Sequence, residues 1–204
     1  MKHLSYCLFD TPLGSCGIAW SEGEDSRETP VARFQLPEAT SKATKLRIAR
    51  LSGAHAPSAP PPPIAKVIDR VRKHLCGEVQ DLRDIPLDFD GAAPFERMVY
   101  RAAREIPVGE TRTYGQLAKA VGRPNAARAV GNALKKNPIA LIVPCHRIQA
   151  AGGRPGGFSA HGGCATKTKM LALEGFRLEQ RPTRAEARKH RRPAGTGNLS
   201  GKLF

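Results

Sequence analysis

The stretch Ile139–Ile148, with the sequence IALIVPCHRI, decides how this chain is interpreted. Its apolar residues 139–143 predict a buried strand, and Pro144 predicts the strand's end because proline has no N–H for a β-ladder. Cys145 and His146 follow at once, so a potential nucleophile stands beside an imidazole at the rim of a rigid element. An arbitrary Cys-His pair is more often a small buried thiol next to a surface histidine, because free cysteine is among the most buried residue types. The surrounding sequence therefore has to decide between the two interpretations.

Two short helices are predicted just before this stretch. Thr113 can cap a helix over residues 114–121, residues 122–125 (GRPN) form a break, and a second helix over 126–136 ends at Asn137-Pro138. This pattern is typical of a helix-turn-helix, although an ordinary helical corner is at least as common. Lys and Arg outnumber acidic residues from 95 to 147, and this local excess favours DNA binding.

The second of these helices is almost bare of bulky side chains on one side. Such a surface can approach DNA closely, and it predicts contacts with the backbone and groove shape more than readout of base edges. Arg128 is the one long side chain on this side. The small residues are Ala126, Ala127, Ala129, Gly131 and Ala133.

A glycine-rich segment, residues 150–163, follows the Cys-His pair. It could be a flexible linker, but Phe158-Ser159 in its middle and a helix predicted over 165–175 favour a shaped loop that approaches a ligand. Glu174 lies near the end of that helix. Residues 177–204 are basic and lack apolar periodicity, so we expect a disordered tail.

The N-terminal half predicts a small supporting domain, and the fold class is α+β. We expect a β-hairpin over 4–20, a third strand over 31–36, helices over 40–51 and 64–75, and a strand over 82–89. Residues 53–63 form a proline-rich insert. The predicted organisation is a supporting domain over 1–91, a DNA-binding domain with the chemistry over 92–176, and the basic tail.

Composition limits the classes of partner. The chain has 204 residues and a formal net charge of +15, which favours a polyanionic partner. Nucleic acid is favoured over an anionic membrane because the sequence has no basic amphipathic segment rich in Trp, Phe or Leu. No apolar run approaches the roughly 20 residues of a membrane helix, and no secretory signal is evident. We therefore expect a soluble, cytoplasmic protein that associates with the nucleoid when it acts.

The five cysteines are odd in number and form no CxxC motif. This spacing predicts neither a disulfide framework nor a zinc ribbon, and a reducing compartment would keep Cys145 a free thiol. We expect no metal and no cofactor, although Cys7, Cys16 and His74 could meet in the folded protein.

Five motifs, in order, resemble the O6-alkylguanine-DNA alkyltransferase family across about residues 93–176. They are IPVGE (106–110) with Tyr114, RAVGNAL (128–134) with Asn137-Pro138, PCHRI (144–148), GGFS (156–159), and the helix from Lys167 to Glu174. The resemblance implies a small ribonuclease-H-like N-terminal domain and a mainly helical, winged-helix-like C-terminal domain. It implies a monomer that binds double-stranded DNA carrying O6-alkylguanine and repairs it by direct damage reversal.

The resemblance also implies residue roles. Cys145 is similar to the alkyl acceptor, His146 to the base that takes the thiol proton through a water, and Glu174 to the carboxylate that orients the base. Asn137 is similar to a brace of the active-site turn, and Tyr114 to the hydroxyl that helps protonate the departing guanine. Ser159 and the carbonyl groups of Cys145 and Ile148 would contact the base, Arg128 would replace the flipped nucleotide, and Ala126, Ala127 and Gly131 would lie against DNA.

This chemistry is physically coherent. Attack on an alkyl carbon needs a thiolate, and a base with its orienting carboxylate can supply one. A stacked lesion is out of reach, so the base must be flipped out. The thioether product cannot be released by the same groups, so we expect each molecule to act once; activity on O4-alkylthymine is left open.

Two other functions fit parts of the sequence. A DNA-binding regulator or lesion sensor without chemistry would not need Cys145 with His146 and Glu174. A cysteine hydrolase usually has its Cys and His far apart in sequence, and it gives no reason for the basic helix-turn-helix.

Overall fold

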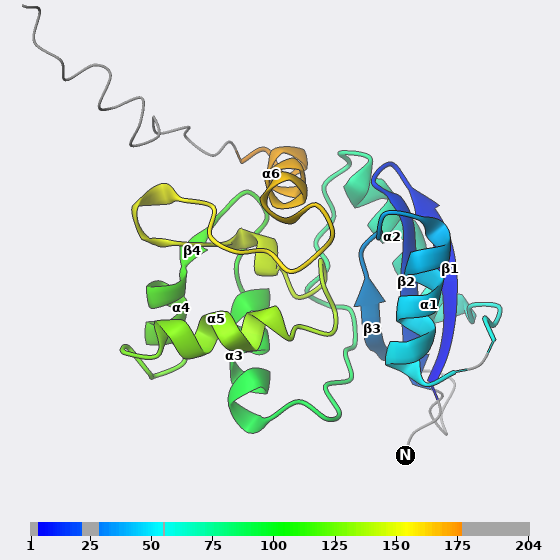
Figure 1. The fold of residues 1–204 in the computed structure, drawn as a ribbon, viewed down its shortest axis with the longest axis horizontal. Coiled ribbons are helices and arrows are strands. Elements are labelled where there is room, and N and C mark those ends of the chain that lie inside the picture. Colours follow the sequence, from blue (N-terminus) through cyan, green and yellow to red (C-terminus); the bar gives the residue numbers. More distant parts are fainter. Residues whose placement is uncertain (1–3, 22–28, 55, 177–204) are drawn as a thin grey trace, which may run out of the picture.

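A computed structural model describes residues 4–21, 29–54 and 56–176 of the chain. It has an N-terminal half built on a three-stranded sheet and a C-terminal half that is mainly helical, side by side (Figure 1). The predicted basic tail, residues 177–204, lies outside the described residues. No helix among those described is both long and apolar enough to cross a membrane.

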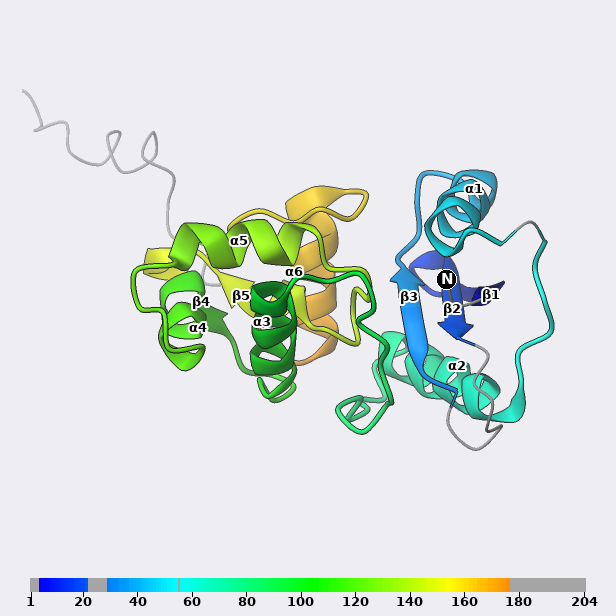
Figure 2. The ribbon, with the colours of Figure 1, turned by 90° about the horizontal axis from the view of Figure 1, so that it is seen from below.

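The N-terminal half is an antiparallel sheet between two helices. Strands β1 (Leu4–Thr11), β2 (Gly14–Ser21) and β3 (Val31–Gln35) pair in that order. Helices α1 (Ser41–Ser52) and α2 (Pro62–Leu75) lie on opposite faces (Figure 2). Alternation along β1 explains this arrangement: Tyr6 packs with Ile48 of α1, whereas Cys7 and Phe9 belong to the main core that includes α2. The predicted hairpin, third strand and both helices are confirmed.

The strand predicted over 82–89 is wrong. This segment runs beside β3 but forms only one isolated bridge, between Val31 and Leu87. Val31 N–H donates to the Pro86 carbonyl, and Asp88 N–H donates to the Val31 carbonyl. Pro86 itself has no N–H, so a regular ladder does not extend through it.

The C-terminal half places two short helices beside the segment that carries Cys145, residues 139–148. Its elements are α3 (Pro94–Arg104), β4 (Arg112–Thr113), α4 (Tyr114–Ala120), α5 (Ala127–Lys135), η1 (Cys145–Arg147), β5 (Ile148–Gln149), η2 (Ala151–Gly153) and α6 (Gly163–Leu173). The Thr113 hydroxyl accepts from Gln116 N–H, which caps α4 as predicted. A tight turn through Gly122, with φ of 71°, joins α4 to α5. The helix-turn-helix prediction matches this geometry.

Residues 139–143 are buried as predicted, except for the half-buried Ala140, but they are not a strand. The segment is a turn with isolated bridges, in which Leu141 has φ of 72° and Val143 N–H donates to the Ile139 carbonyl. The Asn137 side chain satisfies both ends: its amide nitrogen donates to the Val143 carbonyl at 2.9 Å, and its oxygen accepts from Ile139 N–H at 3.0 Å. The Asn137 side chain therefore satisfies main-chain groups of this segment that the predicted strand would have paired in a β-ladder.

Candidate active site

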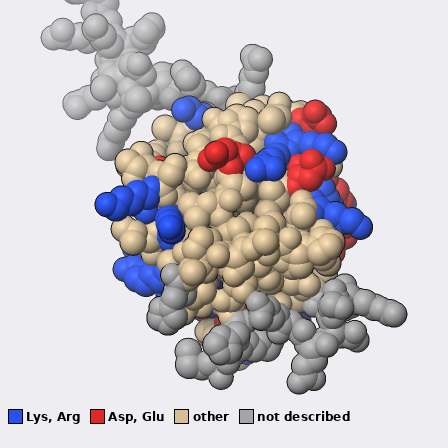
Figure 3. All heavy atoms as spheres, turned by 90° about the vertical axis from the view of Figure 1, so that its right-hand side faces the viewer, with Lys and Arg blue, Asp and Glu red and all other residues tan. Residues whose placement is uncertain are grey.

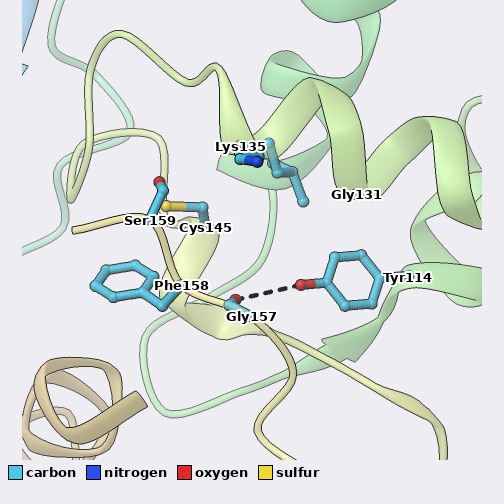
Figure 4. Close-up of a pocket in the computed structure, with 8 residues that line it drawn as sticks. Tyr114, Gly131, Lys135, Cys145, Gly157, Phe158 and Ser159 are labelled. Atoms are coloured by element: carbon cyan, nitrogen blue, oxygen red, sulfur yellow. Dashed lines mark hydrogen bonds between the residues drawn. The ribbon is translucent and has the colours of Figure 1, made fainter. Parts of the chain in front are cut away.

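Cys145 lies in the wall of a pocket of about 320 Å³ between α5 and the glycine-rich loop (Figure 4). The Cys145 residue is only 8 % exposed, whereas Cys76 and Cys164 are exposed. A reagent that alkylates Cys145 selectively must therefore enter the pocket. The pocket is lined by Tyr114, Gly131, Leu134, Lys135, Cys145, Gly157, Phe158 and Ser159.

Tyr114 stands across the pocket from Cys145 (Figure 4), and its hydroxyl donates to the Gly157 carbonyl at 3.4 Å. Burial raises the pKa of Tyr114, so the phenol stays protonated and able to donate near neutral pH. Gly156 has φ of 71°, and a Cβ there would lie 3.1 Å from the Tyr114 ring and 3.2 Å from Ala150 N. Only glycine fits this position comfortably, which explains why the loop can close against the tyrosine.

A buried ionic cluster lies behind Cys145. The Glu174 carboxylate follows the end of α6, and its Oε1 lies 2.8 Å from His146 Nε2. The same carboxylate accepts from Arg147 Nε and from one Arg147 terminal nitrogen, each at 2.8 Å. An ionised carboxylate can only accept, so His146 carries its proton on Nε2 when the ring is neutral. Its Nδ1 then keeps a free lone pair, and this buried atom has no hydrogen-bond partner among the described residues.

The Cys145 thiol needs a base to become a thiolate, because its pKa is raised. Burial raises the pKa of the Cys145 thiol, and the Asn137 hydrogen bond and Lys167 charge oppose this only in part. Burial also lowers the pKa of His146, against the hydrogen bond and charge of Glu174 that raise it. Burial of Glu174 itself would raise its pKa, but hydrogen bonds from His146, His74 and Arg147 hold it well below its usual range. The resting site thus combines a protonated thiol, a neutral imidazole and an ionised carboxylate.

Sequence reasoning missed His74 as a part of this cluster. The His74 side chain, from the last turn of α2, places Nε2 3.1 Å from Glu174 Oε1. The sequence suggested it only as a companion of Cys7 and Cys16, which instead lie in the core of the sheet. No local sequence signal connects positions 74 and 174. Among the described residues, no group of three or more His, Cys, Asp or Glu side chains is arranged to hold a metal ion.

Lys167 was also missed as a structural organiser of the pocket. This fully buried lysine on α6 donates to the carbonyls of Ile148 and Pro155, and burial lowers its pKa to about 8. It thereby connects the end of the reactive segment to the glycine-rich loop. Ile148 is buried and does not line the pocket, whereas Ser159 does. A charged residue amid the otherwise apolar inner positions of α6 was the available signal.

The residues expected at DNA divide between two places. Arg128 is exposed on α5, with Ala126 and Ala127 at the start of the same helix. Gly131 instead lines the pocket, where a Cβ would lie 3.7 Å from the Tyr114 ring. The opposite end of the molecule carries both basic and acidic side chains on a face that is largely formed by other residues (Figure 3).

Comparisons with known proteins agree on one group of relatives. Residues 94–176 match the family model described as 6-O-methylguanine DNA methyltransferase, DNA binding domain. A methylated-DNA–protein-cysteine methyltransferase of Mycobacterium bovis is 38 % identical over 152 residues, which cover 72 % of this chain and 88 % of the relative. One of Mycolicibacterium paratuberculosis is 45 % identical over 114 residues, 56 % of this chain and 67 % of the relative.

Solved structures give the same picture for the fold. The crystal structure of Mycobacterium tuberculosis O6-methylguanine methyltransferase superposes with a TM-score of 0.65 at 33 % identity, covering 88 % of this chain and 96 % of that one. The crystal structure of Mycobacterium tuberculosis OGT in complex with DNA gives a TM-score of 0.64 at 34 % identity, with 83 % and 92 % covered.

Proposed function

This chain belongs to the methylated-DNA–protein-cysteine methyltransferase family, and from this membership we propose that it moves the alkyl group of a flipped-out O6-alkylguanine onto Cys145. The membership makes the protein an enzyme of DNA repair that acts on DNA by alkyl transfer. The acceptor, the extrusion of the base and the roles of individual residues are parts of the proposal. One observation carries it: a buried thiol and a phenol line the same pocket, and an imidazole–carboxylate pair follows the thiol in the chain.

The size of the pocket supports a base as its occupant. A volume of about 320 Å³ lies at the lower end of small-ligand sites, and a stacked base in a duplex could not reach it. The nucleotide would turn out of the helix while Arg128 occupies the space that it leaves. Ser159 and the main-chain carbonyl groups near Cys145 would contact the edge of the guanine. O4-alkylthymine, which carries its alkyl group on a comparable oxygen, is the second substrate to test.

The proposed transfer has two coupled proton movements. The neutral His146 takes the thiol proton at Nδ1, through a bridging water as the family resemblance implies, and Glu174 stabilises the imidazolium that forms. The thiolate sulfur then bonds to the alkyl carbon, and the bond from that carbon to guanine O6 breaks. Tyr114 donates a proton to the departing guanine. The thioether has no route back to the thiol, so each molecule acts once.

The finer domain description is proposed on the same basis. We take residues 1–91 as a ribonuclease-H-like supporting domain and residues 92–176 as a winged-helix-like domain that holds the site in a monomer. The described sheet, its flanking helices and the helix pair α4–α5 are compatible with this division.

The test is the mass of the intact protein after incubation with duplex DNA that contains O6-methylguanine. We expect the addition of one methyl group per molecule, located on Cys145 by peptide mapping, and a plateau at one equivalent when the lesion is in excess. Cys145→Ala should bind DNA but gain no methyl group. A methyl group on Cys7, Cys16, Cys76 or Cys164, or a sustained linear phase past one equivalent, would contradict the proposal.

A further inference from the structure

His74 is a buried titratable residue that the proposed transfer does not use. It lies in the N-terminal half, on the last turn of α2, and is 2 % exposed. Its Nε2 contacts Glu174 Oε1 at 3.1 Å, and this is the same oxygen that contacts His146 Nε2 at 2.8 Å. The N-terminal half therefore reaches the carboxylate of the relay directly.

The hydrogen bonds of His74 define its tautomer. The backbone N–H of Gln80 donates to His74 Nδ1 at 3.2 Å. A backbone N–H can only donate, so Nδ1 carries a lone pair and the neutral ring has its proton on Nε2. That proton points at Glu174 Oε1, which makes His74 a fixed donor to the carboxylate.

The Glu174 carboxylate is surrounded by donors from two sources. His146 and Arg147 both belong to η1, next to the acceptor thiol, and Arg147 contacts both carboxylate oxygens. His74 is a donor from outside the C-terminal half. It fixes the position of Oε1 relative to the docked N-terminal half, independently of the segment that carries Cys145.

We propose that His74 is a positioning residue for alkyl transfer, which holds Glu174 Oε1 in place and limits how strongly this carboxylate retains a proton on His146. The inference rests on the proposed function, because His74 acts through Glu174 and does not touch the substrate pocket. His74 is a third donor to Oε1, beside His146 and Arg147. Because it draws on the same negative charge, the carboxylate stabilises a proton on His146 less strongly. His146 then stays neutral and available to take the thiol proton.

The charged groups around the relay agree with this direction. Burial lowers the pKa of His146, the hydrogen bond and charge of Glu174 at the end of α6 raise it, and the charge of Arg147 lowers it. Lys167 is also on α6, and its charge lowers the pKa of Cys145. When the His74 donor is removed, Glu174 stabilises a proton on His146 more strongly, and the protonated form of His146 becomes more populated. Protonated His146 cannot act as a base, so the acid limb of the pH–rate profile moves to higher pH.

Two substitutions separate the donor from the shape of the ring. His74→Phe keeps an aromatic ring but cannot donate, whereas His74→Gln keeps an N–H donor at a similar reach. Val71→Ala is the matched control, because Val71 is a buried apolar residue of the same helix and has no hydrogen-bonding group to offer the relay. Single-turnover methyl transfer is measured against pH with O6-methylguanine duplex and with free O6-benzylguanine, alongside thermal unfolding of each variant.

We expect His74→Phe to transfer about tenfold more slowly near neutral pH on both substrates, the scale of losing a group that orients a functional side chain. Its acid limb should move to higher pH. His74→Gln should keep most of the rate and the wild-type limb, and Val71→Ala should lower the melting temperature without moving the limb. A His74→Phe profile that coincides with wild type, or a limb that Val71→Ala shifts equally, would overturn the inference.

The wild-type arm separates failure of this inference from failure of the proposed function. Wild-type protein that does not methylate Cys145 contradicts the function, whereas normal wild-type transfer with an unaffected His74→Phe contradicts only the role of His74. If His74→Phe does not fold, the ¹⁵N–¹H NMR spectrum of the wild-type imidazoles still decides. The expected His74 signal is the neutral Nε2–H tautomer, and an Nδ1–H tautomer would refute the inference.

Discussion

At the scale of single residues, Asn137 is proposed to combine a structural and a chemical role. Its amide closes the turn over 139–143 with two hydrogen bonds and also lowers the pKa of the Cys145 thiol. Asn137→Ala should therefore cost about 2 kcal/mol of the free energy of unfolding, at about 1 kcal/mol per hydrogen bond, and should raise the thiol pKa further. Denaturant unfolding and alkylation of Cys145 against pH, with the exposed Cys76 and Cys164 changed to Ser, measure the two effects.

Asn137→Asp distinguishes these two roles. An aspartate still accepts from Ile139 N–H, but its negative charge opposes a thiolate more strongly than alanine does. The thiol pKa should therefore rise more in Asn137→Asp than in Asn137→Ala, and at least as much stability should be lost, because a carboxylate oxygen then faces the Val143 carbonyl in place of the amide donor. If both variants leave the pH dependence of Cys145 alkylation at its wild-type position, Asn137 braces the turn and does nothing for the thiol.

At the scale of elements, α5 lines the pocket and is proposed to contact the DNA as well. Gly131 and Leu134 line the pocket, while Arg128 is exposed on the same helix. We expect Arg128→Ala to slow transfer from duplex DNA at saturating concentration, because flipping a base costs a few kcal/mol that the inserted side chain offsets. Transfer from free O6-benzylguanine, which needs no flipping, should stay near normal.

Arg123→Ala is the control for this prediction, since Arg123 is exposed in the turn that precedes α5. It removes the same charge without removing the inserted side chain, so it should weaken binding mildly and leave the saturated rate unchanged. If the two variants transfer at the same rate at saturating duplex DNA, Arg128 is an ordinary phosphate contact and does not act in base flipping.

At the scale of the whole molecule, a net charge of +15 predicts strongly salt-dependent binding. Each neutralised phosphate releases counterions, so the logarithm of the affinity should fall linearly with the logarithm of the salt concentration. The small residues of α5 predict little discrimination among sequences. Titrations of lesion-free duplexes of several sequences, at several salt concentrations, check both statements; a roughly thousandfold preference for one sequence would favour a sequence-reading regulator.

The sequence by itself determined the elements whose signals are local. Alternation along the hairpin, the apolar face of α2 and the Thr113 cap depend on neighbouring residues, and the structure has these elements where they were expected. The resemblance of residues 144–148 and of the helix that ends at Glu174 to the alkyltransferase family nominated the thiol, the base and the carboxylate, and the fold places the His146 imidazole against the Glu174 carboxylate.

Tertiary structure decided the features in which distant groups satisfy one another. Residues 139–143 are apolar enough for a strand, but the Asn137 amide and the positive φ of Leu141 make them a turn. His74 meets Glu174 only because α2 docks beside α6, a hundred positions along the chain. Local propensity cannot contain such pairs, because a buried carboxylate or main-chain group takes whichever donor the packed elements bring within reach.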